Sequence, residues 1–383
     1  MELLIFDNLS DNAGVSEKNT KSRLRDVIKF AETESVTSNA GREYIVSLIA
    51  NDNNILSSLA IQNKKIGDSL YNAALTDTEC IFSEILPVFD SIAYNPSGNE
   101  TGFYSGYRDS IKSLTSSKQP REFLDKLITH YRNFGTGIKA KYTAFKYDGA
   151  LEGIASADPV SFDSLIGIDH QKNMLISNTK AFIGGGHANN VLLVGDRGTG
   201  KSSSVKALLN MFCRDGLRMA ELPKQHIRNM QKLIDELSVS PHKYILFLDD
   251  LTFESGDPDY HALKISMEGQ LSAMPRNVIV YATSNRRHLI KETWSEREGG
   301  EVHKNDQRQE IASLSERFGI KLVFSSPNRS GYLDIVKSLL AQKSIDMTPD
   351  IERRALIWEM NNSGFSGRCA KQFVESVIAE YSE

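Results

Sequence analysis

The sequence has few cysteines, no large excess of one charge sign and no long apolar run. Its three cysteines, Cys80, Cys213 and Cys369, lie far apart in 383 residues and form no CxxC or His/Cys cluster. Their spacing argues against a zinc site or a disulfide framework and suits a reducing cytosol. The formal net charge of −4 gives no overall attraction to nucleic acid or acidic membranes, although a local basic patch is still possible.

The sequence also lacks the patterns of a membrane-spanning segment and of a secretory signal. No apolar run approaches the roughly 20 residues needed to cross a bilayer. The first residues, MELLIFDNLSDNAG, lack a basic start followed by a long apolar core, which a secretory signal would show. We therefore expect a cytoplasmic protein with no membrane segment.

The strongest motif follows an apolar run, Val191 to Val194, that is typical of a strand buried on both faces. Glycines let the backbone after such a strand curl so that its N–H groups point at an anion, and a helix start adds partial positive charge. Lys201 could reach terminal phosphates, and the Ser202 hydroxyl could bind Mg²⁺. The next eight residues fit the phosphate-loop (Walker A) pattern G-x-x-x-x-G-K-[ST]: Gly195, Asp196, Arg197, Gly198, Thr199, Gly200, Lys201 and Ser202.

We predict a nucleotide-binding site at this loop and include the next residue, Ser203, in it. The alternative is a glycine-rich turn that binds nothing. A tight turn alone has no need of a lysine and a hydroxyl at the start of the helix. The residues after the loop repeat apolar side chains at helical spacing, as in Val205, Leu208, Leu209 and Phe212.

Four further apolar runs, at 217–222, 244–248, 278–283 and 320–324, predict strands separated by helices. This alternation predicts an α/β core with a five-stranded parallel sheet covered on both faces. We place the core at 158–326.

Two flanking regions read as helical. Residues 1–157 have mostly helical spacing and no obvious catalytic signature, so we expect a region for partner binding or oligomerisation. Residues 327–383 are expected to form a small C-terminal helical domain.

Two acids, Asp249 and Asp250, end the third predicted strand, 48 positions after Lys201. A carboxylate at the C-terminal edge of the sheet could hold Mg²⁺ through water. We assign Asp249 to the metal and Asp250 to polarising an attacking water; the alternative is an N-cap for the next helix. Asn285 ends the fourth strand, where its amide would face the γ-phosphate if that strand lies between the other two, or would be a simple turn residue.

The order of GDRGTGKS, YILFLDD, VIVYATSN, LSERFG and FSGRCAKQF resembles the AAA+ ATPase module, a P-loop NTPase core with a helical lid. HYRNFGTGIKAKYTAFKYDG joined to this core resembles more closely a little-characterised family of AAA+ ATPases with a helical N-terminal part. The resemblance runs from about Thr129 to the C-terminus. It implies ATP and Mg²⁺ as ligands, with Lys201 and Ser202 at the phosphates, Asp249 on the metal side and Asn285 at the sensor-1 position.

The resemblance also implies roles outside the loop. FDSLIGIDHQK, with Ile166 and Gly167, is similar to the segment that packs against adenine. Arg317, in LSERFG, matches the arginine finger that enters a neighbouring subunit's site, so a homo-oligomeric ring with shared sites is implied. Arg368, in SGR, matches the sensor-2 arginine of the lid. Both arginines would neutralise phosphoryl oxygens; each could instead be a surface arginine near a helix end.

The sequence departs from the AAA+ pattern at two places. Most modules carry Asp-Glu where this chain has Asp249-Asp250, so either Asp250 or Glu254 could activate the water, and hydrolysis could be slow. Residues 217–237 contain no aromatic-apolar-glycine loop of the kind found in substrate-threading rings. The charged stretch 286–316 is either a partner contact or a mobile loop.

These features favour a Mg-ATP-dependent ATPase that acts on a macromolecular client. Three alternatives stay open: a nucleotide-dependent switch or loader on nucleic-acid machinery, a scaffold that keeps nucleotide as a structural ligand, and a metabolite kinase. Nucleic acid as a partner has no direct support in the residues, and the client itself cannot be read from them.

Overall fold

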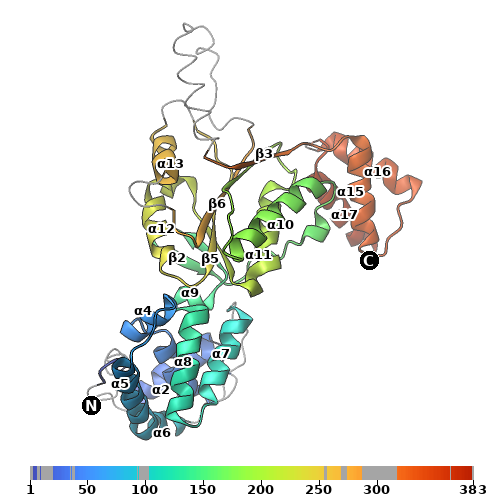
Figure 1. The fold of residues 1–383 in the computed structure, drawn as a ribbon. Coiled ribbons are helices and arrows are strands. Elements are labelled where there is room, and N and C mark those ends of the chain that lie inside the picture. The colour runs from blue at the N-terminus through green and yellow to red at the C-terminus, as the bar shows by residue number, and fades with distance from the viewer. Residues whose placement is uncertain are drawn as a thin grey trace. The chain divides into compact units, whose positions relative to one another are not determined.

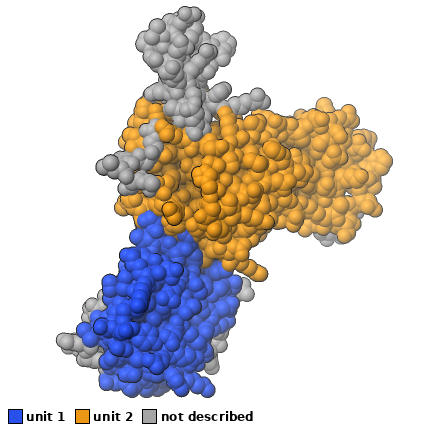
Figure 2. All heavy atoms as spheres, in the orientation of Figure 1, with its two compact units in different colours: residues 1–145, 152–157, 236–242 blue, residues 146–151, 158–235, 243–383 orange. Residues whose placement is uncertain are grey.

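The computed structural model divides the chain into two compact units (Figure 2). Unit 1 comprises residues 1–145, 152–157 and 236–242, and unit 2 comprises residues 146–151, 158–235 and 243–383. The structure describes residues 3–6, 9, 20–34, 36, 39–92, 94, 103–253, 257–268, 274–286, 317–362 and 364–381. Among the described helices, none combines the length and apolar character needed to cross a bilayer.

The described part of unit 1 up to Lys141 is mainly helical (Figure 1). Its buried apolar side chains belong to one cluster. The long helix α8 shows why the sequence folds this way. Pro120 occupies its first turn, where its missing N–H costs nothing, and Gly135 ends it with a positive φ of 77°. Its buried face is mainly apolar and also includes His130. The helices of unit 1 are α2 (Thr20–Thr33), α3 (Ala40–Ala50), α4 (Ile55–Ile61), α5 (Asp68–Cys80), η1 (Ile81–Ile85), α6 (Leu86–Asp90), α7 (Ser105–Thr115), α8 (Pro120–Phe134) and α9 (Ile138–Lys141).

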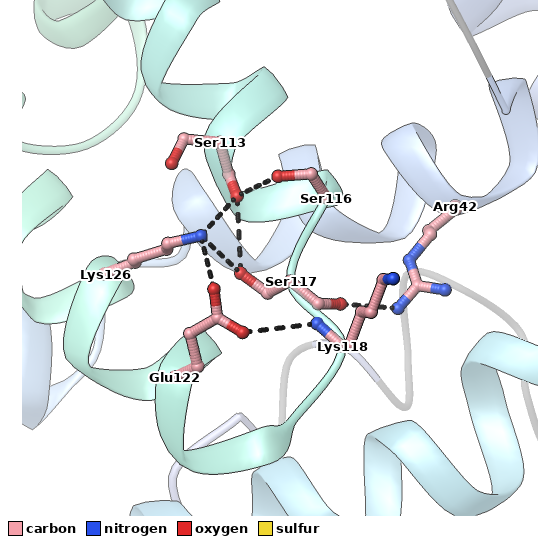
Figure 3. Close-up of polar contacts among 7 residues, drawn as sticks. All are labelled: Arg42, Ser113, Ser116, Ser117, Lys118, Glu122 and Lys126. Carbon is pink, nitrogen blue, oxygen red and sulfur yellow. Dashed lines mark hydrogen bonds and ion pairs between the residues drawn. The ribbon is translucent and has the colours of Figure 1, made fainter.

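The end of α7 is held by side chains from neighbouring helices (Figure 3). Lys126 of α8 donates to the carbonyl oxygen of Ser113 at 3.1 Å and pairs with Glu122 at 2.8 Å. Ser116 donates to the same carbonyl at 2.9 Å, and Arg42 of α3 donates to the carbonyl of Ser117 at 3.1 Å. The bonds to Ser113 satisfy a carbonyl in the last turn of α7, and the bond from Arg42 holds the chain just after the helix.

The chain contains a mostly parallel sheet with strand order β2-β1-β4-β5-β6-β3-β7. Strands β3 to β7 belong to unit 2, whereas the residues of β1 and β2 are divided between the two units. The predicted α/β P-loop core is confirmed, but the sheet has seven strands rather than five. The two that the sequence analysis missed form a hairpin with a turn at Gly149 (φ 79°), in a region predicted to be mostly helical. The strands are β1 (Ala144–Tyr147), β2 (Leu151–Ile154), β3 (Val191–Gly195), β4 (Leu217–Glu221), β5 (Lys243–Leu248), β6 (Val278–Ser284) and β7 (Ile320–Phe324).

The central strands are buried along their length, as expected for a sheet covered on both faces. Helix α11 (Lys201–Phe212) packs against β3, β4 and β6, and α10 (Asp169–Ile183) packs against α11 and β7 (Figure 1). Lys224–Asn229 forms a 3-10 segment before α12 (Met230–Ser238), and α13 (Pro258–Glu268) follows β5. Because β3, β5 and β6 are neighbours and parallel, their carboxyl ends meet at one edge of the sheet.

The C-terminal helices are α15 (Arg329–Ala341), α16 (Pro349–Asn361) and α17 (Gly367–Tyr381). They share a separate apolar core that includes Tyr332, Val336 and Phe373. Asn328 accepts a hydrogen bond from Gly331 N at 2.8 Å at the start of α15, and Thr348 accepts one from Ile351 N at 3.3 Å at the start of α16. These caps fix where the helices begin.

Candidate functional site

The phosphate loop joins β3 to α11 through residues whose backbone only glycine adopts readily. Gly195 has φ 144°, and a Cβ there would lie 1.8 Å from the carbonyl oxygen of Phe324 on β7. Gly200, at the N-cap of α11, has φ 95°. The loop is braced by Thr199 Oγ1, which donates to the carbonyl oxygen of Asp196 at 2.8 Å. This backbone leaves the N-terminus of α11 facing the loop, where an anion would be stabilised.

Lys201 is 6% exposed and lies within the loop. Its Nζ donates to the carbonyl oxygens of Gly195 at 2.8 Å and Asp196 at 2.7 Å, and to Asn285 Oδ1 at 3.0 Å. Burial lowers the pKa of Lys201, while the nearby carboxylates, Asp250 most of all, oppose this shift. The ammonium group is therefore hydrogen-bonded to three neutral oxygens of the loop and of Asn285. Phosphate oxygens of a bound nucleotide could replace these three acceptors.

The two residues predicted to serve the metal lie together. Ser202 Oγ donates to Asp249 Oδ1 at 2.6 Å. In the described part of the chain, no cluster of three or more His, Cys, Asp or Glu side chains could hold a metal ion by itself. A site with one carboxylate and one hydroxyl suits Mg²⁺, which is usually held by few protein ligands, by water and by the phosphates of its nucleotide. The residues present therefore fit a Mg-nucleotide.

Asp250 and Asn285 also meet at this edge of the sheet. Asn285 Nδ2 donates to Asp250 Oδ1, and β6 lies between β5 and β3, as the placement of Asn285 in the sequence analysis requires. Asp250 has φ 51°, a left-handed conformation that is unusual for a residue with a side chain. Glu254, the alternative acid, lies outside the described residues.

Thr283 is a site residue that the sequence analysis missed. Its hydroxyl donates to Asp249 Oδ1 at 2.5 Å and accepts the N–H of Asp250 at 2.8 Å. The available signal was the spacing: in a strand, residues two apart point to the same face, so Thr283 and Asn285 share one.

The C-terminal helical domain contacts the phosphate loop through the start of α17. The N–H of Arg368 donates to the carbonyl oxygen of Gly198 at 3.2 Å, and a Cβ added at Gly198 would lie 3.2 Å from Arg368 Cβ. Ser366, 5% exposed, accepts the N–H of Cys369 at 3.2 Å, which caps the helix. The backbone of Arg368 therefore lies beside the loop, and its role at the phosphates stays a prediction.

The segment predicted to contact adenine lies between the core and this helical domain. Ile166 packs against the apolar core of the helical domain, and Leu165 Cδ2 would lie 3.6 Å from a Cβ at Gly200. Gly167 has φ 78°. Gln342, the C-cap residue of α15, donates to the carbonyl oxygen of Asp163 at 2.8 Å, which connects the segment to the helical domain.

The remaining predicted residues differ in position. Asp196 and Arg197 are exposed in the loop, and Ser203 is half-buried in the first turn of α11.

Arg317 is exposed in a turn three residues before β7. Because β7 runs parallel to β3, with Ile320 opposite Val191, Arg317 lies at the edge of the sheet where the strands begin. The five residues of β3 span roughly 17 Å, so the phosphate loop of the same chain is far from Arg317. Of the stretch 286–316, all but Arg286 lies outside the described residues.

The comparisons with known proteins concern family and fold. The family described as "Protein of unknown function (DUF815)" has a model that matches residues 140–381. No curated protein matches the chain. Three solved structures of RuvB variants from Thermotoga maritima match with 15%, 15% and 14% identity and TM-scores of 0.39, 0.41 and 0.38. Each match covers 58% of this chain and 65%, 66% and 65% of the RuvB chains, so just under two thirds of their length is spanned. Likeness at this level does not bear on function.

Proposed function

The chain belongs to the DUF815 family, whose description assigns no activity, and we propose from the site that it is a Mg-ATP-binding ATPase of the AAA+ type. One observation carries the proposal. The buried ammonium of Lys201 and two acids from another strand converge on one glycine-rich loop at a helix start. A structural turn has no need of this combination, whereas a triphosphate with its divalent ion requires each part of it.

Each residue has a defined task in this proposal. The loop backbone and Lys201 bind the phosphates, and Ser202 with Asp249 would hold the Mg²⁺ ion. A bound Mg²⁺ would neutralise charge that develops on the transferring phosphoryl group. Asp250 accepts a proton from the attacking water, and the amide of Asn285 orients Asp250 through its hydrogen bond. Arg368 stabilises the phosphates from the side of the lid.

Arg317 is assigned to a neighbouring copy. It lies at the opposite edge of the sheet from its own phosphate loop, so it would act only on another subunit's nucleotide. We propose a homo-oligomer with shared sites, which uses hydrolysis to do conformational work on a macromolecular client through the helical N-terminal region.

A nucleotide-dependent switch with little hydrolysis is the second candidate. It is favoured by the residue at position 250, because aspartate reaches one methylene less far toward a water than glutamate does. In that case DNA or RNA could stimulate turnover, and the stimulation should weaken steeply with salt.

Phosphate release by the full chain tests the proposed hydrolysis. Asp250→Asn removes the proton acceptor but keeps the shape, so we expect turnover to fall about a hundredfold with ATP binding retained. Asp334→Asn, at an exposed position on α15, is the matched control and should behave as wild type. Wild-type turnover by Asp250→Asn would exclude Asp250 as the base. The absence of phosphate release from the wild type, with or without nucleic acid, would exclude ATPase activity.

A further inference from the structure

The acidic turn after β5 is held to the end of β6 by one backbone hydrogen bond and one side-chain hydrogen bond. Leu251 N donates to the carbonyl oxygen of Thr283 at 2.8 Å, and Ser284 Oγ donates to the carbonyl oxygen of Leu251 at 2.7 Å. Both strands are parallel neighbours, with Leu248 opposite Ala282. The position of the two acids is therefore set by the last residues of β6 as well as by β5.

Within this region, one hydroxyl contacts both acids. Thr283 Oγ1 donates its proton to Asp249 Oδ1 at 2.5 Å and accepts the N–H of Asp250 at 2.8 Å. A threonine hydroxyl has one proton to donate and two lone pairs, so it can make both bonds at once. The side chain is 1% exposed, which leaves little freedom for another arrangement.

The bond to Asp249 determines how that carboxylate is turned. Ser202 Oγ and Thr283 Oγ1 both donate to Oδ1 of Asp249, at 2.6 and 2.5 Å. Two donors on one oxygen fix the rotation of the carboxylate plane. Outer hydrogen bonds of this kind orient metal ligands and affect metal affinity.

The bond to Asp250 supports a left-handed backbone. Asp250 has φ 51°, a conformation that is uncommon for residues with a Cβ, although aspartate adopts it more readily than most. Its N–H is held by the Thr283 hydroxyl while its carboxylate accepts the amide of Asn285. Thr283 of β6 thus holds the backbone of Asp250, and Asn285, the residue after β6, holds its side chain.

We propose that Thr283 is a positioning residue that sets the orientation of Asp249 toward the metal and of Asp250 toward the attacking water. This inference rests on the proposed Mg-ATP site and adds a determinant of metal affinity to it. In this proposal Thr283 acts through the two acids that its hydroxyl contacts.

The test measures metal binding directly, with Mn²⁺ in place of Mg²⁺ and electron paramagnetic resonance of the full chain with ATP. Thr283→Val keeps the shape but removes the hydroxyl, so the dissociation constant for Mn²⁺ should rise about tenfold. ATP affinity in EDTA should stay unchanged, and the Mg²⁺ concentration at half-maximal phosphate release should shift in the same direction. Thr283→Ser keeps the hydroxyl and should restore Mn²⁺ affinity to within about twofold of wild type, since both bonds can re-form.

Thr179→Val is the matched control, because Thr179 is a fully buried residue of the same unit whose hydroxyl contacts Tyr281 Oη at 2.9 Å, away from the acids. It should leave Mn²⁺ affinity unchanged even if it lowers the melting temperature. Wild-type Mn²⁺ affinity in Thr283→Val, or equal impairment of the valine and serine variants, would overturn the role of Thr283 while leaving the ATP site intact. If the wild type binds neither ATP nor Mn²⁺, the proposed function fails and this inference fails with it.

Discussion

The ammonium group of Lys201 lies 3.0 Å from the side-chain oxygen of Asn285, and this contact joins the ends of β3 and β6. The other end of the same amide donates to Asp250. One side chain therefore links the lysine expected at the phosphates to the acid expected at the water. If a phosphate oxygen accepted the hydrogen bond from Lys201, the side-chain oxygen of Asn285 would lose this donor.

Asn285→Ala should impair hydrolysis more than binding. Without the amide, Asp250 loses the group that orients it, so we expect turnover to fall about a hundredfold, similar to the loss of one preorganised donor elsewhere. ATP affinity should change by less than about threefold, because the loop and Lys201 still bind the phosphates. Single-turnover phosphate release together with equilibrium binding separates the two effects. Loss of binding without a change in single-turnover rate would contradict the assignment.

Arg317→Ala should keep ATP binding but lose turnover. An arginine that enters a neighbour's site is worth on the order of a thousandfold in rate. A mixture offers a stricter test: Lys201→Ala has a damaged loop but an intact Arg317, and Arg317→Ala has the reverse. If sites are shared, mixing the two inactive variants should restore part of the phosphate release. Full activity of Arg317→Ala alone would exclude a shared site.

His130 should make unit 1 less stable in mild acid. The side chain is 1% exposed, Nδ1 lies 2.8 Å from Ser110 Oγ, and burial lowers the pKa to about 4. The folded pKa lies below the unfolded value of about 6.5, so the unfolded state takes up the proton first. The contribution of neutral His130 to the free energy of unfolding is therefore fully present above pH 6.5. It falls by about 3 kcal/mol as the pH is lowered to 4.

Denaturant unfolding of the full chain between pH 7 and pH 4 checks this sign. His130→Asn does not titrate, so its stability should fall less steeply over this range than that of the wild type, whatever its stability at pH 7. His187→Asn changes an exposed histidine and should retain the wild-type slope. An unchanged slope in His130→Asn would show that this residue does not account for the acid sensitivity.

The sequence predicted the parts of the site that have strong local patterns. The five strands of the core, the loop from Gly195 to Ser202 and the acids after β5 were each marked by an apolar run or a spaced motif. For Asn285 the prediction carried a condition, that its strand lies between the two motif-bearing strands, and the observed order β5-β6-β3 meets it.

The remaining features depend on contacts between distant residues. β1 and β2 have four residues each, too few for periodicity to distinguish them from a loop. The bond of Asp250 N to Thr283 joins residues 33 positions apart, so no local pattern predicts it. The same holds for the contact between Arg368 N and Gly198 O, which joins residues 170 positions apart.

The most direct test of the central claim is equilibrium binding of ATP with Mg²⁺ to the full chain, by isothermal titration calorimetry, for the wild type, Lys201→Ala and Lys206→Ala. Lys206 lies on the same helix but pairs with Asp158 at 3.7 Å near its surface, so its variant should bind as the wild type does. We predict that only Lys201→Ala loses affinity, by about a hundredfold or more, since a buried charge-assisted contact to phosphate is removed. Equal binding by all three proteins, or no binding by the wild type, would contradict the account.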